Sequence, residues 1–178
     1  MEVNFEVILA CDITGGIGKN GIIPWKCRED LINFKNITMN GILIMGRKTV
    51  ENLPFLIGRK IFMLTRRINS NEIPIVINSN NITVINSFEE FINIYISSPD
   101  LIGKRIFIAG GSEIYASVFR NNFKYAIKKY HITFIPENFY CDVSINLSKL
   151  IDIVEKCREK RVTYFNMENI TKYIEYIM

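Results

Sequence analysis

Residues 15–34, GGIGKNGIIPWKCREDLINF, join a glycine-rich loop to the start of a helix that carries an acid on its apolar side. If this helix begins near Arg28, Asp30 and Phe34 lie on one face, and Ile37 continues that face one turn later. A carboxylate held against apolar side chains is partly desolvated, so its pKa rises and its burial is costly unless a partner donates hydrogen bonds. A ligand with paired N–H groups would be such a partner. The alternative is that Asp30 is an ordinary first-turn acid, which the helix dipole favours.

The loop before this helix, and the tryptophan that follows it, each admit two interpretations. Four glycines between residues 15 and 21 allow the backbone to lie close against a flat ligand or to open as a lid. Trp25 is the only tryptophan of the chain. Its indole is either a core anchor or an N–H donor in a ligand pocket.

The composition is that of a folded chain with a substantial core. The 178 residues are 48% hydrophobic and 12% aromatic, which excludes a disordered chain and predicts one domain over residues 1–178. The net charge of +4 comes from lysines and arginines scattered along the chain. Such a charge could attract an anionic small molecule without indicating a nucleic-acid surface. We expect a monomer.

Targeting signals and metal-binding motifs are missing from the sequence. The first residues, MEVNFEVILAC, lack the basic start and long apolar core of a signal peptide, and no run approaches the roughly 18 apolar residues of a membrane span. With one histidine and no paired cysteine spacing, we expect no metal site and four reduced, buried thiols, at Cys11, Cys27, Cys141 and Cys157. These features predict a cytoplasmic protein, with a nuclear one as the alternative.

Short apolar runs alternate with helical segments, which predicts an α/β fold around a central sheet. Strands are expected at residues 5–11, 42–45, 60–64, 105–109 and 130–135, of which 5–11 and 105–109 should be buried, and edge strands are expected at 73–77 and 81–85. A capping box of Ser87 and Glu90 should open a helix. The last strands are expected at 150–157 and 171–177, around a loop at 163–169, although 150–157 could equally form an amphipathic helix.

Three strand ends carry residues suited to an anionic ligand. They are Gly46, Arg47, Lys48 and Thr49; then Thr65, Arg66 and Arg67; then Gly110, Gly111 and Ser112. Because the carboxyl ends of parallel strands meet at one edge of a sheet, the first two segments, which share their chemistry, support each other as a phosphate-binding region. The third lets the backbone approach a ligand while helix N–H groups face its phosphates. The alternative for any one of them is a solvated basic turn. The sequence has no GxGxxG motif, and Glu113 would be misplaced directly against a phosphate. We expect His131 to be an exposed edge residue rather than a catalyst.

In their order along the chain, several motifs together resemble the dihydrofolate reductase family: VILAC, GIGKNGIIPW, EDLINF, IMGRKT, GRK, LTR, IFIAGGSEIY and HITFI. Each motif is weak alone, but the ordered set is specific and covers essentially the whole chain. The resemblance implies a central, mostly parallel eight-stranded sheet with an antiparallel C-terminal edge strand, flanked by helices. It also favours a strand over a helix at 150–157.

The resemblance implies NADPH-dependent reduction of 7,8-dihydrofolate to 5,6,7,8-tetrahydrofolate, by hydride transfer and protonation of the pterin imine nitrogen, in support of thymidylate and one-carbon metabolism. Dihydrofolate and antifolates are the implied ligands. Asp30 would pair with the pterin and assist proton delivery through water, Thr133 would hydrogen-bond the acid, and Trp25 would hold water near the pterin. Arg59 would bind the carboxylate of the glutamate tail. The pterin and benzoyl slots would be lined by Ile8, Phe34, Leu53, Leu56 and Ile108.

The resemblance also implies where NADPH would bind. The nicotinamide and ribose would be covered by Ala10, Ile17, Gly18, Lys19, Asn20 and Gly21. The phosphates would be met by Gly46, Arg47, Lys48 and Thr49, and by Gly110, Gly111, Ser112, Glu113, Ile114 and Tyr115, with a cis bond between Gly110 and Gly111. The 2′-phosphate, which distinguishes NADPH from NADH, would be bound beside Leu64 by Thr65 and Arg66, with Arg67 as the alternative.

Some positions depart from the family pattern, and two other functions stay open. Val50 stands where a tryptophan is usual, Ile57 replaces a proline, Ala109 replaces a valine or glycine, and residues 27–29 replace a proline-containing turn. A related reductase for another pterin or pyrimidine would not need Asp30 and Arg59 together. A non-enzymatic RNA-binding protein would show an affinity that falls steeply with salt.

Overall fold

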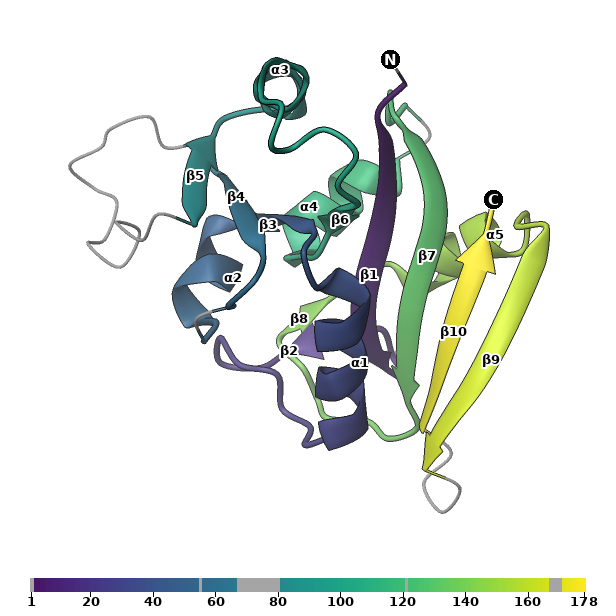
Figure 1. The fold of residues 1–178 in the computed structure, drawn as a ribbon. Helices are drawn as coiled ribbons and strands as arrows, with labels where there is room; N and C mark the ends of the chain where they lie inside the picture. Colours follow the sequence, from purple (N-terminus) through teal and green to yellow (C-terminus); the bar gives the residue numbers. More distant parts are fainter. Residues whose placement is uncertain (1, 55, 67–80, 121, 167–170) are drawn as a thin grey trace.

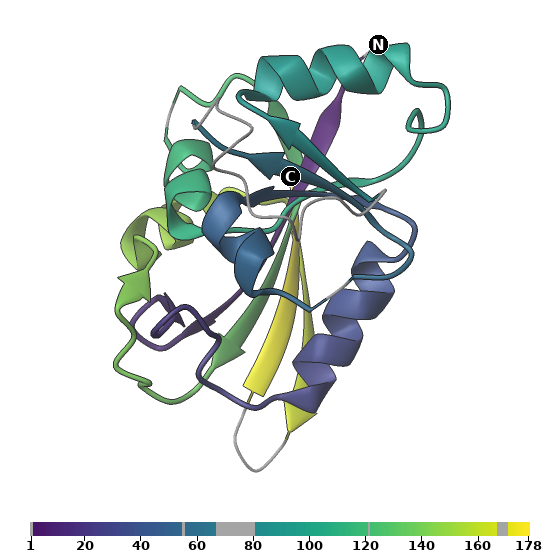
Figure 2. The ribbon, with the colours of Figure 1, turned by 90° about the vertical axis from the view of Figure 1, so that its left-hand side faces the viewer.

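The structure is a computed structural model that describes residues 2–54, 56–66, 81–120, 122–166 and 171–178. Figure 1 and Figure 2 show, from two directions, a large twisted sheet with helices around it. The strands are β1 (Asn4–Asp12), β2 (Gly16–Gly18), β3 (Ile42–Gly46), β4 (Lys60–Leu64), β5 (Ile82–Ile85), β6 (Ile106–Ile108), β7 (Ala126–Ile135), β8 (Val143–Ser144), β9 (Glu159–Asn166) and β10 (Thr171–Ile177). The helices are α1 (Arg28–Thr38), α2 (Arg47–Asn52), α3 (Phe88–Ser97), α4 (Ser112–Val118) and α5 (Leu147–Val154).

In the described part of the chain, eight strands form the main sheet, in the order β5-β4-β3-β6-β1-β7-β10-β9, and β2 pairs with β8 in a small second sheet. The neighbours from β5 to β7 are parallel, whereas β10 is antiparallel to both β7 and β9. This confirms the predicted α/β fold, with its mostly parallel sheet and antiparallel C-terminal edge. The parallel arrangement also brings the carboxyl ends of β1, β3, β4 and β6 to the same edge, where ligands gather in such sheets.

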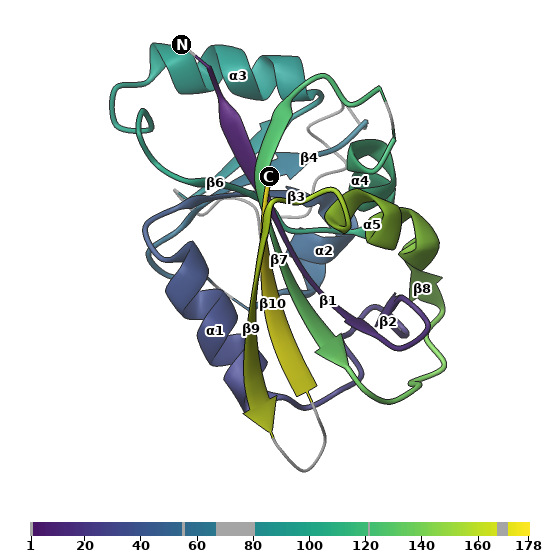
Figure 3. The same cartoon turned by 90° about the vertical axis from the view of Figure 1, so that its right-hand side faces the viewer.

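The two faces of the sheet bury separate apolar clusters. Along β1, Val7 and Leu9 belong to a larger cluster that also contains Phe91 of α3 and Leu150 of α5. Ile8, between them in sequence, belongs to a second cluster, as expected from the alternation of side chains along a strand. This second cluster, called here the α1-face cluster, includes Leu43, Met45, Val50, Leu56 and Phe107, with Phe34 and Ile37 of α1 packed against it. Figure 3 shows the sheet nearly edge-on, with α1 on one side and α4 and α5 on the other.

The central strands were predicted well because they are continuous apolar runs buried on both faces. The predictions for 60–64 and 171–177 are confirmed residue for residue, and the strands predicted at 5–11, 42–45, 105–109 and 130–135 are present with different ends; β7, for example, begins at Ala126. The edge strand at 81–85 appears as β5, whereas the predicted strand at 73–77 lies outside the described residues. The capping box is also confirmed, because the Ser87 side chain accepts a hydrogen bond from the Glu90 backbone N–H at 3.1 Å.

The prediction of a strand at 150–157 is wrong, because the helix α5 (Leu147–Val154) occupies most of that segment. Leu150 and Val154 are buried at i and i+4, and the Asn146 side chain caps the helix by accepting from the Lys149 N–H at 2.9 Å. The helical alternative was therefore correct. The antiparallel strand comes later, as β9, so the predicted loop at 163–169 is wrong as far as Asn166, and the rest of it lies outside the described residues.

The prediction that His131 is an exposed edge residue is also wrong. His131 lies in β7 between β1 and β10 and is 2% exposed. Its ring nitrogens make hydrogen bonds of 2.6 Å to the Glu6 carboxylate and to the Tyr173 hydroxyl. Burial alone would raise the pKa of Glu6, but hydrogen bonds from Arg105 and His131 outweigh it and hold that pKa at about 2. The histidine is thus part of a buried polar network.

Two further observations concern the cysteines and the helices. All four cysteines are free thiols, but only Cys11 is buried, so the expectation of burial is wrong for Cys27, Cys141 and Cys157. In the described part of the chain, no helix combines the length and the apolar character needed to cross a membrane.

Candidate active site

Asp30 lies in the first turn of α1, which begins at Arg28 as predicted. The Thr133 hydroxyl, on β7, donates a hydrogen bond of 2.5 Å to the Asp30 Oδ1 atom. Within the described part of the chain, this hydroxyl is the only hydrogen-bond donor to the carboxylate. Burial raises the pKa of Asp30, and the bond from Thr133 lowers it without cancelling that effect. The structure therefore confirms the expectation of a desolvated acid on the apolar side of the helix.

The side chains predicted to line the substrate slot divide between the two faces of the sheet. Ile8 and Leu56 belong to the α1-face cluster, and Phe34 and Leu53 pack against it, on the same side as Asp30. Ile108 does not, because its side chain is in the larger cluster on the opposite face. The neighbouring Ala109 packs on the α1 face instead. Alternation along β6, read outward from Phe107, was the signal that could have identified Ala109.

Trp25 is 8% exposed and packs edge-on against Phe139, with ring centroids 5.6 Å apart. Its indole N–H is buried and has no hydrogen-bond partner within the described part of the chain. Trp25 is therefore a core anchor and also a donor that lacks an acceptor. A buried donor without an acceptor is costly, and a polar ligand beside Trp25 would supply one.

Arg59 follows a turn in which Gly58 has a φ of +76°. The arginine is only 7% exposed; its Nε donates to the Ile57 carbonyl at 3.2 Å, and its Nη1 lies 3.4 Å from the Thr38 hydroxyl at the end of α1. Burial lowers the pKa of this guanidinium. It has no acidic partner among the described residues, so it is suited to receive the carboxylate of a ligand.

Asp12, at the end of β1, is a buried acid that the sequence reasoning missed. Its carboxylate accepts hydrogen bonds from the Thr14 N–H and hydroxyl, at 2.8 and 2.7 Å, from the Gly16 N–H at 2.8 Å and from the Phe139 N–H at 3.1 Å. The Cys141 thiol is a weaker donor at 3.6 Å. Asp12 therefore fastens the glycine loop to the segment after β7. The signal in the sequence was an aspartate with a threonine two residues later, which is typical of an Asx turn.

The glycine loop is held as a short hairpin rather than left open. Lys19 and Ile22 exchange backbone hydrogen bonds of 2.9 and 3.0 Å, and β2 pairs with β8. The Asn20 N–H donates to the Asp142 carboxylate at 2.8 Å. A Cβ on Gly16 would come within 2.7 Å of both Asp12 and Cys141, so only glycine fits there. Residues 17–21 are thus positioned near the end of β1, where Ala10 pairs in register with Thr133.

The ends of β3 and β6 approach each other through backbone alone. The Gly46 N–H donates to the Gly110 carbonyl at 2.7 Å, and the Gly110–Gly111 peptide bond is cis, as the resemblance implied. A Cβ on Gly111 would lie 3.0 Å from the Thr49 hydroxyl oxygen. Glycines leave this surface free of side chains, as the close approach of a ligand requires.

The residues after this glycine pair divide into surface and core. Ser112 is half-buried and Glu113 is exposed, whereas Ile114 and Tyr115 are buried in the larger cluster. The Tyr115 hydroxyl donates to the Ile8 carbonyl at 2.7 Å, and burial raises its pKa. Of the predicted cofactor residues in this segment, Ile114 and Tyr115 therefore have side chains that serve the core.

The predicted cations lie at the strand ends, but two of them are paired with acids. Arg47 binds Glu51 on the next turn of α2 through contacts of 2.6 and 2.9 Å. Arg66, just after β4, binds Glu113 at 2.8 Å. Lys48 is exposed, Leu64 is half-buried and Thr65 is 8% exposed. Arg67 lies outside the described residues. The sequence reasoning anticipated the cations and did not anticipate their acidic partners.

Comparisons with known proteins agree with this arrangement. A family model described as Dihydrofolate reductase matches residues 4–167. A "Putative dihydrofolate reductase" of Caenorhabditis elegans is 32% identical and aligns with 92% of this chain and 87% of its own length. "Dihydrofolate reductase type 8" of Escherichia coli is 29% identical, over 86% of this chain and 87% of that protein.

A solved structure shares the fold. It is described as dihydrofolate reductase from Enterococcus faecalis complexed with NADP(H) and RAB-propyl, and it superimposes with a TM-score of 0.67 at 24% identity, over 97% of this chain and 95% of that one. At that identity the likeness concerns the fold. Because the family match spans most of the sequence and a relative that is 32% identical aligns with nearly all of it, the chain belongs to the dihydrofolate reductase family.

Proposed function

We propose that this chain reduces 7,8-dihydrofolate to 5,6,7,8-tetrahydrofolate, with NADPH as the reductant. Membership of the dihydrofolate reductase family supports this reaction. The structural observation that carries the proposal is the Asp30–Thr133 pair: a desolvated carboxylate, on the apolar face of α1, with one hydrogen-bond donor among the described residues. A carboxylate in this condition requires further donors, and the amino group and ring N–H of a pterin are donors of the right kind.

Asp30 would act by binding the pterin and by holding a proton close to it. The Thr133 hydroxyl already occupies Oδ1, so it fixes the orientation of the carboxylate and leaves the rest of its lone pairs for the ligand. Burial raises the pKa of Asp30, which favours its protonated form at a higher pH than an exposed aspartate would allow. Asp30 can therefore help to deliver a proton, through water, to the imine nitrogen of the substrate.

The apolar side chains around Asp30 would exclude bulk water from the bound ring. Ile8, Phe34, Leu53 and Leu56 form the wall on the α1 side, and we assign Ala109 to this wall in place of Ile108. Trp25 would offer its unpaired indole N–H to the ligand or to an ordered water. Arg59 would bind the carboxylate of the glutamate tail, because it is a buried cation without an acidic partner among the described residues.

The residues present fit NADPH. The contact between Gly46 and Gly110–Gly111 leaves a backbone surface without side chains, and Lys48 and Arg66 lie exposed close to the ends of β3 and β4. Thr65 and Arg66 would bind the 2′-phosphate, while Ala10 and residues 17–21 would cover the nicotinamide and its ribose. NADPH, when bound, supplies the hydride. The chain's own part is to orient the two ligands and to keep water away from them.

We further propose that the protein works as a monomeric domain over residues 1–178 in the cytoplasm, where tetrahydrofolate would serve thymidylate and one-carbon metabolism. Antifolates would compete with dihydrofolate for Asp30, because they present the same kind of paired N–H donors to the carboxylate. The basic surface would serve anionic small molecules, and no step of this function requires nucleic acid or a membrane.

The test is the initial rate of NADPH oxidation by the purified protein, with and without dihydrofolate. We expect a rate that depends on dihydrofolate and that a stoichiometric amount of methotrexate abolishes. If NADPH binds but dihydrofolate produces no rate, the reductase assignment is wrong, and other pterins and pyrimidines become the substrates to test. The same assay with those compounds separates the two outcomes.

A further inference from the structure

The ion pair between Arg66 and Glu113 joins two elements of the proposed cofactor site that are far apart in sequence. Arg66 follows β4, and Glu113 lies in the first turn of α4, directly after β6. The Arg66 Nη2 and Glu113 Oε2 atoms are 2.8 Å apart, and the two side chains are 88% and 81% exposed. An ion pair this exposed contributes little to stability because water and salt compete with it. Its partners can therefore be exchanged for others at little cost to the fold.

The neighbouring pair, Arg47 and Glu51, differs in each of these respects. Both residues belong to α2, four positions apart, and their side chains are only 22% and 24% exposed. The guanidinium contacts both carboxylate oxygens, at 2.6 and 2.9 Å. This pair is local and partly shielded, so it fixes Arg47 on its own helix. Of the two arginines, Arg66 is the one whose present carboxylate partner a phosphate could readily displace.

We propose that Glu113 competes with the 2′-phosphate of NADPH for Arg66, and that this competition limits how strongly the protein prefers NADPH over NADH. The inference rests on the proposed function, which assigns the 2′-phosphate to Arg66. A phosphate monoester carries a charge of about −1.5 to −2 at neutral pH. To reach Arg66 it must displace the Glu113 carboxylate or share the guanidinium with it, and sharing places two anions close together. NADH has no such group, so it binds without disturbing the pair.

Removing the charge of Glu113 should therefore tighten the binding of one cofactor and not of the other. In Glu113→Gln the side chain keeps its size and an oxygen acceptor, but it no longer neutralises Arg66 or repels a phosphate. Charge interactions of this kind, at a solvent-exposed site, correspond to a change of about five- to tenfold in affinity. We expect NADPH to bind about five- to tenfold more tightly, and NADH to bind within about twofold of its original affinity.

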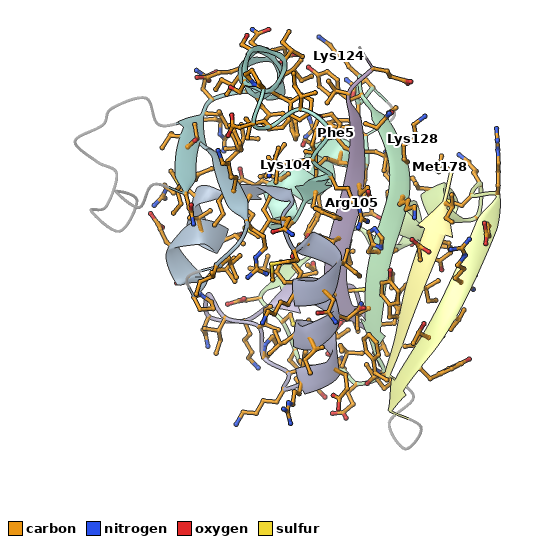
Figure 4. The ribbon with its side chains drawn as sticks, in the orientation of Figure 1. Phe5, Lys104, Arg105, Lys124, Lys128 and Met178 are labelled. Carbon is orange, nitrogen blue, oxygen red and sulfur yellow. The ribbon has the colours of Figure 1, made fainter. Side chains whose placement is uncertain are left out.

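The experiment measures the dissociation constants of NADPH and NADH, without substrate, from the quenching of the fluorescence of Trp25, the only tryptophan. The matched control is Glu89→Gln, which changes the net charge by the same amount. Glu89 is 3.7 Å from Lys124 in another exposed pair, with side chains 60% and 77% exposed. Figure 4 shows Lys124 beside the starts of β1 and β7, whereas Arg66 and Glu113 follow the ends of the parallel strands β4 and β6. Circular dichroism and the melting temperature verify that each variant is folded.

The result that supports the inference is a gain in NADPH affinity in Glu113→Gln that NADH and the Glu89→Gln control do not share. An equal gain for both cofactors, no gain, or weaker NADPH binding overturns it. In an Arg66→Ala background the gain should become clearly smaller. A gain of full size there would show that Glu113 acts without Arg66, which also overturns the competition. If the unaltered protein binds NADPH no better than NADH, the proposed 2′-phosphate contact fails and the inference fails with it.

Discussion

Asp12 lies at the end of β1, before the glycine loop, and Asp30 lies in α1, after it. The surroundings of these two acids shift their pKa values in opposite directions. Burial by itself would raise the pKa of both. At Asp12, hydrogen bonds from Thr14, Gly16 and Phe139 outweigh burial, and the pKa lies below its ordinary value. At Asp30 the hydrogen bond from Thr133 does not outweigh burial, and the pKa lies above its ordinary value.

The difference shows that the number of hydrogen-bond donors, more than burial, decides whether a buried carboxylate has a structural role or can bind a ligand. The Asp12 carboxylate accepts hydrogen bonds from Thr14, Gly16 and Phe139, so it holds the glycine loop in place without a ligand. Within the described part of the chain, the Asp30 carboxylate accepts a hydrogen bond from Thr133 alone, so it can accept further hydrogen bonds from a ligand with N–H groups. A perturbed acid of this kind, at the ligand-binding edge of a parallel sheet, is typical of a functional site.

The largest expected effect is on catalysis at Asp30. Asp30→Asn should slow dihydrofolate reduction by about 10²- to 10⁴-fold at neutral pH, the range typical of losing a general acid, because the amide cannot hold the proton. NADPH affinity should be unchanged, and the loss should be smaller at low pH, where the substrate is already protonated. Steady-state rates across pH provide the test. Near-normal turnover at every pH would remove Asp30 from the mechanism.

The next largest effect is on stability at Asp12. Asp12→Asn replaces an acceptor oxygen by an NH₂ group that faces backbone N–H donors, so at least one buried donor loses its partner. We expect the free energy of unfolding, measured with urea, to fall by about 2–4 kcal/mol. The exposed Asp152 of α5 provides the control, since Asp152→Asn should change stability by no more than about 0.5 kcal/mol. Equal losses in the two variants would mean that the Asp12 bonds do not hold the loop.

A smaller effect of opposite sign is expected for the stability of Asp30→Asn. Because the folded-state pKa of Asp30 is raised, its contribution to stability is fully present below the unfolded-state value, near 3.8, and is lost as the pH rises through the folded-state pKa. The variant should therefore be more stable than the original at pH 7, by about 0.5–2 kcal/mol, and the gain should fade as the pH falls toward 3.8. Urea titrations at several pH values measure this gain. If Asp30→Asn is less stable than the original protein at pH 7, the buried, ionised Asp30 does not destabilise the fold.

For Asp12 the linkage has the reverse sign. Its folded-state pKa is lowered, so its contribution is present above the unfolded-state value of about 3.8 and is lost as the pH falls through the folded-state pKa. The cost of Asp12→Asn should therefore diminish only in acid. Asp12→Asn and Asp30→Asn should therefore differ in how their free energy of unfolding depends on pH. This difference distinguishes a carboxylate with several hydrogen-bond donors from one with few.

The smallest expected effect is at Thr133. Thr133→Val removes the only donor to Asp30 within the described part of the chain, so the carboxylate loses its orientation and its pKa rises further. Losing one such bond should weaken methotrexate binding by about three- to tenfold. Fluorescence titration measures the affinity, and Thr133→Ser, which keeps the hydroxyl, is the matched control. If the valine and serine variants bind equally well, the hydroxyl does not prepare Asp30 for the ligand.

The fold could be predicted where the sequence carries strong local patterns. The buried runs that became β1, β3, β4 and β6 are continuous and apolar, and such runs indicate central parallel strands. At α5 the pattern Leu147, Leu150, Ile151 and Val154 has helical spacing, and the error came from preferring the family resemblance to that pattern. His131 was misjudged because its burial depends on Glu6 and Tyr173, which are 125 and 42 positions away along the chain.

The sequence predicted which types of residue form the site, but it predicted less well which of these residues contact one another. The position of Asp30 on the face of Phe34 follows from helix periodicity alone, and its pairing with Thr133 came from the family resemblance. Which residue of β6 faces the site depends on the phase of the strand, so Ile108 was chosen where Ala109 lies on that face. The Arg66–Glu113 pair depends on how β4 and α4 pack, and no local pattern contains that information.

A titration of the two carboxyl groups by ¹³C NMR, with Asp12→Asn and Asp30→Asn providing the assignments, would show directly whether the two pKa values are shifted in opposite directions. We expect the carboxyl of Asp12 to titrate below the ordinary aspartate value of 3.8 and the carboxyl of Asp30 to titrate above it. Bound methotrexate, by donating to the carboxylate, should then lower the pKa of Asp30 and leave that of Asp12 in place. If the carboxyl groups of Asp12 and Asp30 titrate at the same pH, or in the reverse order, their surroundings do not shift the two pKa values in opposite directions.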